Sequence, residues 1–384
     1  MNLLIFSYES AGHYLEYIHH LYIYAYRCMP DDEVTFVLPP AFRERMQHLD
    51  FPERESVRLR FMSPEEMAAY AKGSNFLLRA CRMTALLKRY VKLLKPDAVF
   101  LPSLVAFIPW IVFAGKRLHA SGIEYRIPGR RTGKVGLSVR MSDNLKLLVY
   151  AYAPSIRKVL LLNDKIYAET YNRRFRTSRF TFLPDPIVPV PLDKAVSCPI
   201  PLDKLEGKKV FLHCGGMGER KGTFTALEAI ELLPQETRCK AAFIFAGRID
   251  NKDEVIFRNT VKELSAGTEF YFIEGFLPFE QLAGLFRCSD YVLVPYKNVL
   301  QSSGVIGHAA QFGKPVIGPA EGLLGSLITE YGLGYTLPQL SAKSLSRLIS
   351  ELVQEETHTI NGSSYSDICT PDNFSKAVFD SMKK

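Results

Sequence analysis

The sequence predicts an α/β protein in which two domains each contain a parallel β-sheet covered by helices. Short apolar runs alternate with helix-length segments, as in sheets buried on both faces. The 384 residues exceed what one hydrophobic core usually supports. Six prolines from Pro184 to Pro201 predict a linker near the middle of the chain.

Six strands are expected in the first half. They are residues 2–7, 33–39, 57–62, 97–102, 158–163 and 180–184. Residues 98–115 carry no charge over almost the length of a membrane span. Because Pro102 and Pro109 interrupt this stretch, we expect a buried strand followed by a buried helix; a shallow membrane contact stays open as the alternative.

Five strands are expected in the second half. They are residues 208–214, 241–247, 269–275, 291–295 and 314–319. A helix is predicted for about residues 303–312, and a final amphipathic helix for the C-terminal residues. We therefore divide the chain into residues 1–190, 191–365 and 366–384.

The seven cysteines are odd in number, scattered, and without metal-ligand spacing. This pattern predicts reduced thiols, a cytoplasmic location, and neither a metal site nor another cofactor. The first ten residues lack the basic start and long apolar stretch of a signal peptide, and a first strand is expected there instead.

Positive charge is concentrated in one segment. Residues 116–179 hold 15 Lys or Arg and 4 Asp or Glu, whereas the whole chain has a net charge of +8. This segment favours a phosphate-containing partner or an anionic membrane surface, with Arg126, Arg130, Arg131 and Lys134 as contact residues. No nucleic-acid-binding motif accompanies the charge. The alternative is a basic face that binds only water.

The glycine-rich sequence GGMGERKG, residues 215–222, directly follows a predicted strand. Glycines let backbone N–H groups approach a phosphate, and the next helix adds unsatisfied donors. Gly216 and Gly218, with Arg220 and Lys221, therefore predict an anion-binding loop. The sequence fits neither a P-loop nor a complete dinucleotide fingerprint, so an exposed turn is the competing interpretation.

A second loop-to-helix junction follows at residues 298–305. Ser302 and Ser303 are suited to cap the predicted helix, while the backbone amides of Ser303, Gly304 and Val305 point outward. Two anion-binding junctions in one half predict a diphosphate ligand.

Five motifs together resemble the C-terminal domain of family 4 glycosyltransferases of the GT-B fold. They are ERKG, FIFAGRID, EGFLPFEQLAGLFRCSDYVLVPY, QSSGVIGHAAQFGKPVIGP and GLGYTLP. The resemblance covers residues 210–338 well and the first half only loosely. It implies two Rossmann-like domains that face each other across a cleft, and a C-terminal helix that returns to the first domain.

The resemblance also implies a set of donor-binding residues. Arg220, Lys221 and the amides of residues 303–305 correspond to the groups that hold the donor diphosphate. Gly12 corresponds to a turn that closes over the donor phosphate. The loop that contacts the base corresponds to Gly275, Phe276 and Leu277, with Leu282 nearby.

Two positions depart from the family pattern. The family commonly has two glutamates eight positions apart; here the second is His308, and the first falls near Leu300 or Gln301. An imidazole can donate to a ribose hydroxyl but lacks the two acceptor oxygens of a carboxylate. Gly216 stands where the family often has an arginine.

The implied activity is transfer of a sugar from a nucleotide-diphosphate sugar to an acceptor hydroxyl, without a metal and with retention. UDP is favoured over GDP, and the expected acceptor is a glycan or lipid-linked molecule. His13 either positions or deprotonates that hydroxyl or has a structural role, and Glu9 more simply orients the same loop. The alternatives are a sugar-nucleotide epimerase of similar fold and a non-catalytic nucleotide-sugar-binding subunit.

Overall fold

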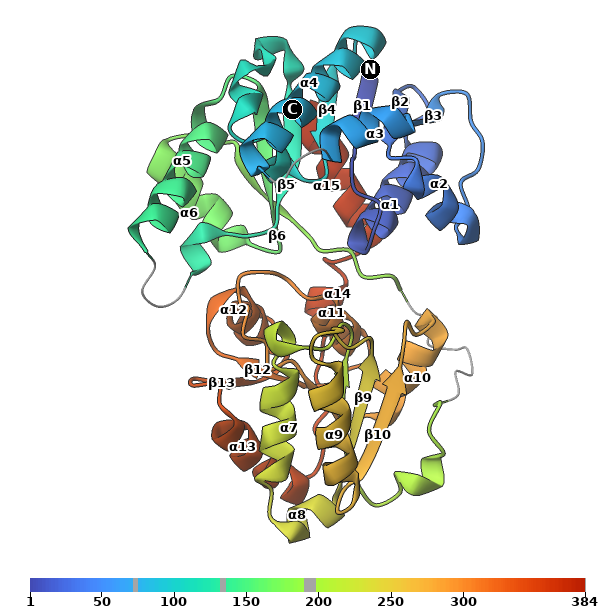
Figure 1. Ribbon diagram of the computed structural model, residues 1–384, viewed down its shortest axis with the longest axis vertical. Helices are drawn as coiled ribbons and strands as arrows, with labels where there is room; N and C mark the ends of the chain where they lie inside the picture. Colours follow the sequence, from blue (N-terminus) through green and yellow to red (C-terminus); the bar gives the residue numbers. More distant parts are fainter. Residues whose placement is uncertain (72–74, 132–135, 190–197, 384) are drawn as a thin grey trace. The chain divides into compact units, whose positions relative to one another are not determined.

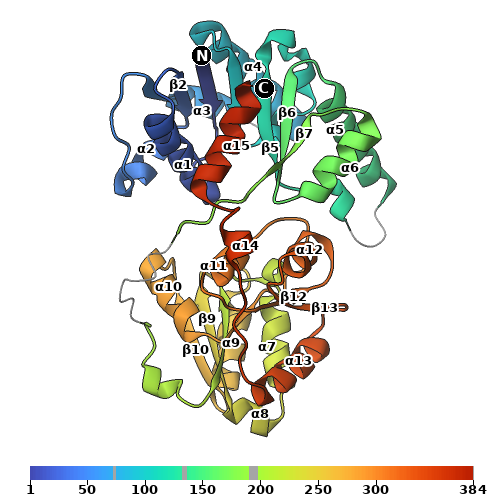
Figure 2. The same cartoon turned by 180° about the vertical axis from the view of Figure 1, so that it is seen from behind.

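The computed structural model describes residues 1–71, 75–131, 136–189 and 198–383. The chain divides into two compact units. Unit 1 comprises Met1–Gly129, Gly133–Pro186 and Pro371–Lys384, and unit 2 comprises Arg130–Thr132 and Ile187–Thr370. Figures 1 and 2 show the ribbon from opposite sides.

Unit 1 contains a seven-stranded parallel sheet in the order β3-β2-β1-β4-β5-β6-β7. Its strands are β1 Asn2–Phe6, β2 Glu33–Leu38, β3 Val57–Phe61, β4 Ala98–Leu101, β5 Ala120–Glu124, β6 Ile156–Leu162 and β7 Phe180–Leu183. Its helices are α1 His13–Cys28, α2 Ala41–Arg45, α3 Pro64–Ala71, α4 Phe76–Leu94, α5 Leu137–Tyr152, α6 Lys165–Phe175 and α15 Pro371–Lys383. All six predicted strands are present, and β5 is an addition to them.

Alternate side chains of these strands enter two separate apolar cores, as expected of a sheet covered on both faces. One core joins the strands to α1 and α15. The other core joins them to α4, α5 and α6. Helix α15 lies against α1 in both views (Figures 1 and 2), so residues from the end of the chain complete the core of the first unit.

The uncharged stretch at residues 98–115 differs from the prediction in one respect. It forms β4, but two short 3₁₀ segments, Leu104–Phe107 and Trp110–Ala114, follow in place of an α-helix. Prolines lack a backbone N–H and restrict the preceding residue, so Pro109 divides the segment. No described helix combines the length and apolar composition needed to cross a bilayer.

Unit 2 contains a six-stranded parallel sheet in the order β10-β9-β8-β11-β12-β13. Its strands are β8 Lys209–Cys214, β9 Ala241–Gly247, β10 Glu269–Glu274, β11 Tyr291–Leu293, β12 Val316–Pro319 and β13 Gly334–Leu337. Its helices are α7 Thr223–Glu231, α8 Gln235–Cys239, α9 Glu254–Ser265, α10 Phe279–Cys288, α11 Gly304–Gln311, α12 Gly322–Glu330, α13 Ala342–Gln354 and α14 Ser363–Ser366. The five predicted strands are again present, with β13 in addition.

The strand order of unit 2 reverses between β8 and β11. In open α/β sheets such a reversal opens a crevice at the carboxyl ends of the strands, where ligands bind. The loops after β8 and β11 are the glycine-rich loop and the polar loop singled out in the sequence. The topology therefore places both predicted anion-binding junctions at the reversal point of one sheet.

Candidate functional site

The glycine-rich loop follows β8 and needs glycine at two of its positions. Gly218 has a φ of 154°, and a Cβ there would lie 2.5 Å from Asp250 Oδ2. Gly222 has a φ of 68°, and a Cβ there would lie 1.7 Å from the carbonyl oxygen of Pro295. The loop lies so close against its neighbours that only glycine fits at these two positions.

Three buried residues fix the loop through a chain of hydrogen bonds. The backbone N–H of Gly218 donates to Thr223 Oγ1 over 2.9 Å, and Thr223 Oγ1 lies 3.0 Å from His213 Nε2. His213 Nδ1 lies 3.0 Å from the carbonyl oxygen of Leu293.

Only one arrangement of protons satisfies this chain in a neutral imidazole. A carbonyl oxygen only accepts, so His213 Nδ1 carries the proton, and Nε2 accepts from the Thr223 hydroxyl. Burial lowers the pKa of His213 to about 4, which keeps the ring neutral at pH 7. His213 is a buried structural residue, and its ring connects the loop to β11.

Lys221 connects the glycine-rich loop to the second junction. Its Nζ lies 3.7 Å from the ring centroid of Tyr296, a cation–π contact. The Tyr296 hydroxyl lies 3.1 Å from Ser303 Oγ, at the start of α11. Arg220 is exposed, and its carbonyl oxygen accepts from the backbone N–H of Lys297 over 3.2 Å.

The second junction matches the predicted helix but differs in its capping. Ser303 is the N-cap residue of α11, and its hydroxyl makes no capping hydrogen bond because it faces Tyr296 instead. Gly304 is exposed and Val305 is half-buried. A Cβ at Gly215 would lie 3.9 Å from Val305 Cγ2, so the two junctions are neighbours.

Three further residues of the predicted donor set surround this junction. Gln301 and Ser302 are half-buried in the loop before Ser303. His308 lies one turn into α11, where its Nδ1 is 3.5 Å from Gln311 Oε1. Burial lowers the pKa of His308, so its ring is neutral at pH 7 and presents one donor and one acceptor.

The predicted base-contacting loop follows β10 in the same sheet. Gly275 has a φ of 109°, and its N–H donates to the carbonyl oxygen of Gly247 over 3.1 Å. The side chain of Phe276 is 94% exposed. Leu277 and Leu282 are half-buried and pack against a core of unit 2. This solvent-exposed aromatic ring, next to the edge strand of the sheet, is available to stack on a flat ligand.

In unit 1, the predicted residues of the first turn lie at the start of α1. Gly12 has a φ of 59° and precedes His13, whose ring centroid lies 5.1 Å from that of Tyr17 and 5.0 Å from that of Tyr125. Although His13 is exposed overall, these rings exclude water from part of the imidazole, and the pKa of His13 falls to about 4. Partial burial of Glu9 raises the pKa of its carboxyl group.

Three of the four basic residues predicted for an acceptor or a membrane lie in the described part of the chain. Arg126 and Arg131 are exposed. Arg130 groups with unit 2, where its Nη1 donates to Ser326 Oγ over 2.6 Å. Lys134 lies outside the described residues.

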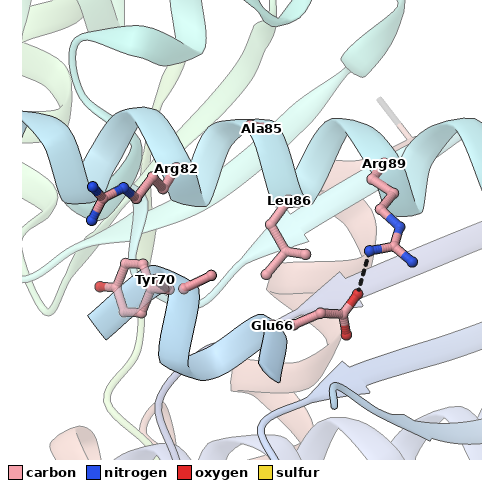
Figure 3. Close-up of a pocket in the computed structure, with 7 residues that line it drawn as sticks. Glu66, Tyr70, Arg82, Ala85, Leu86 and Arg89 are labelled. Atoms are coloured by element: carbon pink, nitrogen blue, oxygen red, sulfur yellow. Dashed lines mark ion pairs between the residues drawn. The ribbon is translucent and has the colours of Figure 1, made fainter. Parts of the chain in front are cut away.

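Unit 2 and unit 1 each contain a surface cavity beside elements described above. One, of about 380 Å³, adjoins Tyr296 at the carboxyl ends of β12 and β13 and has Lys297, Glu321 and Gln339 among its polar lining residues. The other, of about 340 Å³, lies between α3 and α4 of unit 1. Figure 3 shows Arg89 pointing toward Glu66 at one end of it, with 3.1 Å between the charged atoms. None of the predicted site residues lines this second cavity.

Sequence reasoning missed two residues that hold the site together. Tyr296 bridges Lys221 to Ser303, and Thr223 anchors Gly218. Both had a weak signal, because Tyr296 ends the strand motif VLVPY and Thr223 follows the last glycine of the loop. Among the residues that the structure describes, no group of three or more His, Cys, Asp or Glu side chains is placed to hold a metal ion.

Solved structures share this architecture along the whole chain. The glycosyltransferase WaaG, involved in lipopolysaccharide biosynthesis, matches with a TM-score of 0.66 at 15% identity, over 100% of this chain and 99% of WaaG. Anabaena HepE in complex with UDP and glucose matches with a TM-score of 0.65 at 14% identity, over 100% and 99%. The protein therefore has the GT-B fold, as predicted.

Two sequence matches concern part of the chain. Residues 200–365 match the model of the family "Glycosyl transferases group 1". The probable glycosyltransferase WbjE of Pseudomonas aeruginosa is 30% identical over 182 residues, which are 46% of this chain and 43% of WbjE. This chain thus aligns with less than half the length of that relative. The match of residues 200–365 to this family model agrees with the predicted resemblance to GT-B glycosyltransferases, whereas family 4 and retention stay predictions.

Proposed function

We propose that the protein transfers a sugar from a UDP-sugar to a hydroxyl of a glycan or lipid-linked acceptor. The observation that carries this proposal is the pair of loop-to-helix junctions at the β8/β11 reversal point, joined by the contacts of Lys221, Tyr296 and Ser303. Backbone donors and a cation that converge from two loops suit a diphosphate. The UDP bound by HepE and the role of WaaG in lipopolysaccharide biosynthesis support the nucleotide and the acceptor class.

The proposed reaction needs no metal. The bond between the sugar C1 and the β-phosphate oxygen breaks, and negative charge grows on the diphosphate. Lys221, Arg220 and the N–H groups of Gly304 and Val305 stabilise that charge. The acceptor oxygen bonds to C1 on the face that the diphosphate leaves, and its proton passes to the departing phosphate oxygen. The configuration at C1 is then retained, and UDP is released.

His13 fits a positioning role in this scheme better than a role as general base. A group with a pKa of about 4 is a weak base at pH 7, but its neutral ring can accept a hydrogen bond from an acceptor hydroxyl. If positioning is its role, His13→Asn lowers turnover while the dependence of rate on pH between 6 and 8 stays unchanged.

The test combines nucleotide binding with product release. Calorimetry should show UDP binding to the wild type and at least tenfold weaker binding to Lys221→Met, since a charge-assisted hydrogen bond contributes about 1.5–3 kcal/mol. The matched control is Lys262→Met, which removes an exposed lysine from α9 of the same unit. Equal UDP affinity of both variants and the wild type would reject the site.

Product analysis then separates the candidate activities. A UDP-sugar together with glycan or lipid-linked acceptors should yield UDP only when an acceptor is present. Conversion of the sugar without any acceptor would identify an epimerase. Tight UDP binding without turnover on a panel of acceptors would favour the non-catalytic binding subunit.

A further inference from the structure

Helix α5 of unit 1 presents an apolar stripe to solvent. Apart from Val139 (40% exposed), its exposed large apolar side chains are Leu137 (75%), Met141 (64%), Leu145 (57%), Leu148 (47%) and Tyr152 (59%). Steps of three and four residues place these side chains on one side of the helix. The opposite side carries Leu147, Tyr150 and Ala151 into the core of unit 1. Helix α5 is thus apolar on the side that the core covers and also on its outer side.

Among the described residues of unit 1, no element covers the outer side of α5. In both views α5 lies at the margin of unit 1, with α6 beside it (Figures 1 and 2). Helix α6 contacts α5 along its flank, where Tyr152 Oη donates to the carbonyl oxygen of Phe175 over 3.2 Å. Scattered exposed apolar residues are normal on a soluble protein, but a continuous stripe along four helical turns marks an interaction surface.

Three arginines are among the exposed residues of α5 and its neighbour α6. Arg140 on α5 and Arg173 and Arg174 on α6 are exposed. The guanidinium of Arg174 lies next to α5, since its Nη2 donates to Asn144 Oδ1 over 3.4 Å. Both helices belong to residues 116–179, the segment that holds 15 Lys or Arg and 4 Asp or Glu.

Charge decides what kind of partner fits this surface. A second copy of the chain would bring two basic surfaces together, and like charges repel across an interface. An anionic bilayer instead attracts arginines at its headgroups and receives apolar side chains just below them. An apolar stripe bordered by cations is the pattern of a helix that lies in the plane of a membrane interface.

We propose that α5 and the flanking arginines of α6 form a membrane-contact surface. Helix α5 lies parallel to an anionic bilayer, with Leu137, Met141, Leu145 and Leu148 inserted at the level of the headgroups. The proposal does not depend on the proposed glycosyl transfer, because binding to vesicles can be measured without any sugar donor. It places the membrane contact on α5 and α6, whereas the sequence suggested Arg126, Arg130, Arg131 and Lys134.

The test is cosedimentation of the full chain with lipid vesicles. Wild-type protein should sediment with vesicles of phosphatidylglycerol and phosphatidylcholine, less so in high salt, and not with pure phosphatidylcholine. The triple variant Met141→Gln, Leu145→Gln, Leu148→Gln should partition at least about tenfold more weakly, since each inserted apolar side chain adds to the binding free energy. Arg140→Gln, Arg173→Gln, Arg174→Gln should lose the preference for anionic lipid.

The matched control is Val255→Gln, Ile256→Gln. These residues are 72% and 61% exposed on α9 of unit 2, so the control removes apolar surface of the same kind elsewhere. Circular dichroism establishes that each variant is folded, and the single variant Leu145→Gln replaces the triple one should that fail. The proposal is overturned if the wild type ignores anionic vesicles, or if the α5 variants bind them as well as the control does. A wild-type dimer that the α5 changes convert to a monomer would instead assign the stripe to a second copy.

Discussion

Replacing Thr223 by valine tests whether the His213–Thr223–Gly218 chain holds the glycine-rich loop. Thr223 is fully buried, and its hydroxyl serves both the N–H of Gly218 and Nε2 of His213. Valine has nearly the same shape but neither donates nor accepts. The variant therefore leaves two buried polar groups without a partner.

The expected cost follows from those two groups. Each unsatisfied buried group costs about 1–3 kcal/mol, and the added methyl group returns about 1 kcal/mol through burial. The net destabilisation is then about 1–5 kcal/mol. At a slope of about 2–3 kcal/mol per molar urea, a loss near 3 kcal/mol lowers the urea midpoint of unit 2 by about 1 M.

The assay is urea unfolding followed by circular dichroism, with hydrogen exchange of the peptide that contains residues 215–222. The amide of Gly218 should exchange faster in the valine variant because its acceptor is gone. Thr223→Ser keeps the hydroxyl and should keep the slow exchange. Thr225→Val makes the same chemical change two residues further along α7 and serves as the matched control. A stability within 0.5 kcal/mol of wild type, or serine and valine variants that behave alike, would refute the reasoning.

Three further predictions concern the same unit. Gly222→Ala should destabilise unit 2 by about 3 kcal/mol or more, because φ is 68° at this position and the new Cβ would lie 1.7 Å from the carbonyl oxygen of Pro295. Gly216→Ala is the control, since no atom lies within 4 Å of the added Cβ, and it should have little effect in the same urea assay. The pKa of His213 is about 4 in the folded protein and near 6.5 when unfolded, so the unfolded chain binds more protons between these values. Stability should therefore fall by roughly 3 kcal/mol from pH 6.5 to pH 4, and a His213→Gln variant that keeps the full slope in urea titrations would contradict this. Phe276→Ser should leave stability unchanged, because the ring is 94% exposed, yet weaken UDP binding about tenfold by calorimetry; unchanged affinity would exclude a stacking contact with the base.

Most strands that the sequence predicted contain an apolar run, and β3 alternates apolar residues with arginines. The two that it missed, β5 and β13, show neither pattern. Strand β5, Ala120–Glu124, is fully buried but includes Ser121, Gly122 and Glu124. A Cβ at Gly122 would lie 2.7 Å from the carbonyl oxygen of Leu101, so packing between neighbouring strands, not hydrophobicity, selected glycine there.

The sequence was sufficient to predict which loops follow the carboxyl ends of strands and therefore contribute to the candidate site. Parallel strands place their carboxyl ends at one edge of the sheet, and β8 and β11 are adjacent strands, so the loops that follow them are neighbours. The orientation of side chains was not predictable in the same way. Ser303 was expected to cap α11 with its hydroxyl, but Tyr296 competes for that hydroxyl, and this contact depends on tertiary packing.

Helix α15 belongs to unit 1 but is synthesised after unit 2. Its side chains Phe374, Val378, Phe379 and Met382 belong to the core of unit 1, and the Ser121 hydroxyl donates to the carbonyl oxygen of Ser381 over 2.9 Å. Residues 371–383 are translated only after the whole of unit 2. During translation, one face of the sheet of unit 1 therefore stays incompletely covered until unit 2 has been made. A nascent chain that is released early would expose that face, which favours aggregation or chaperone binding.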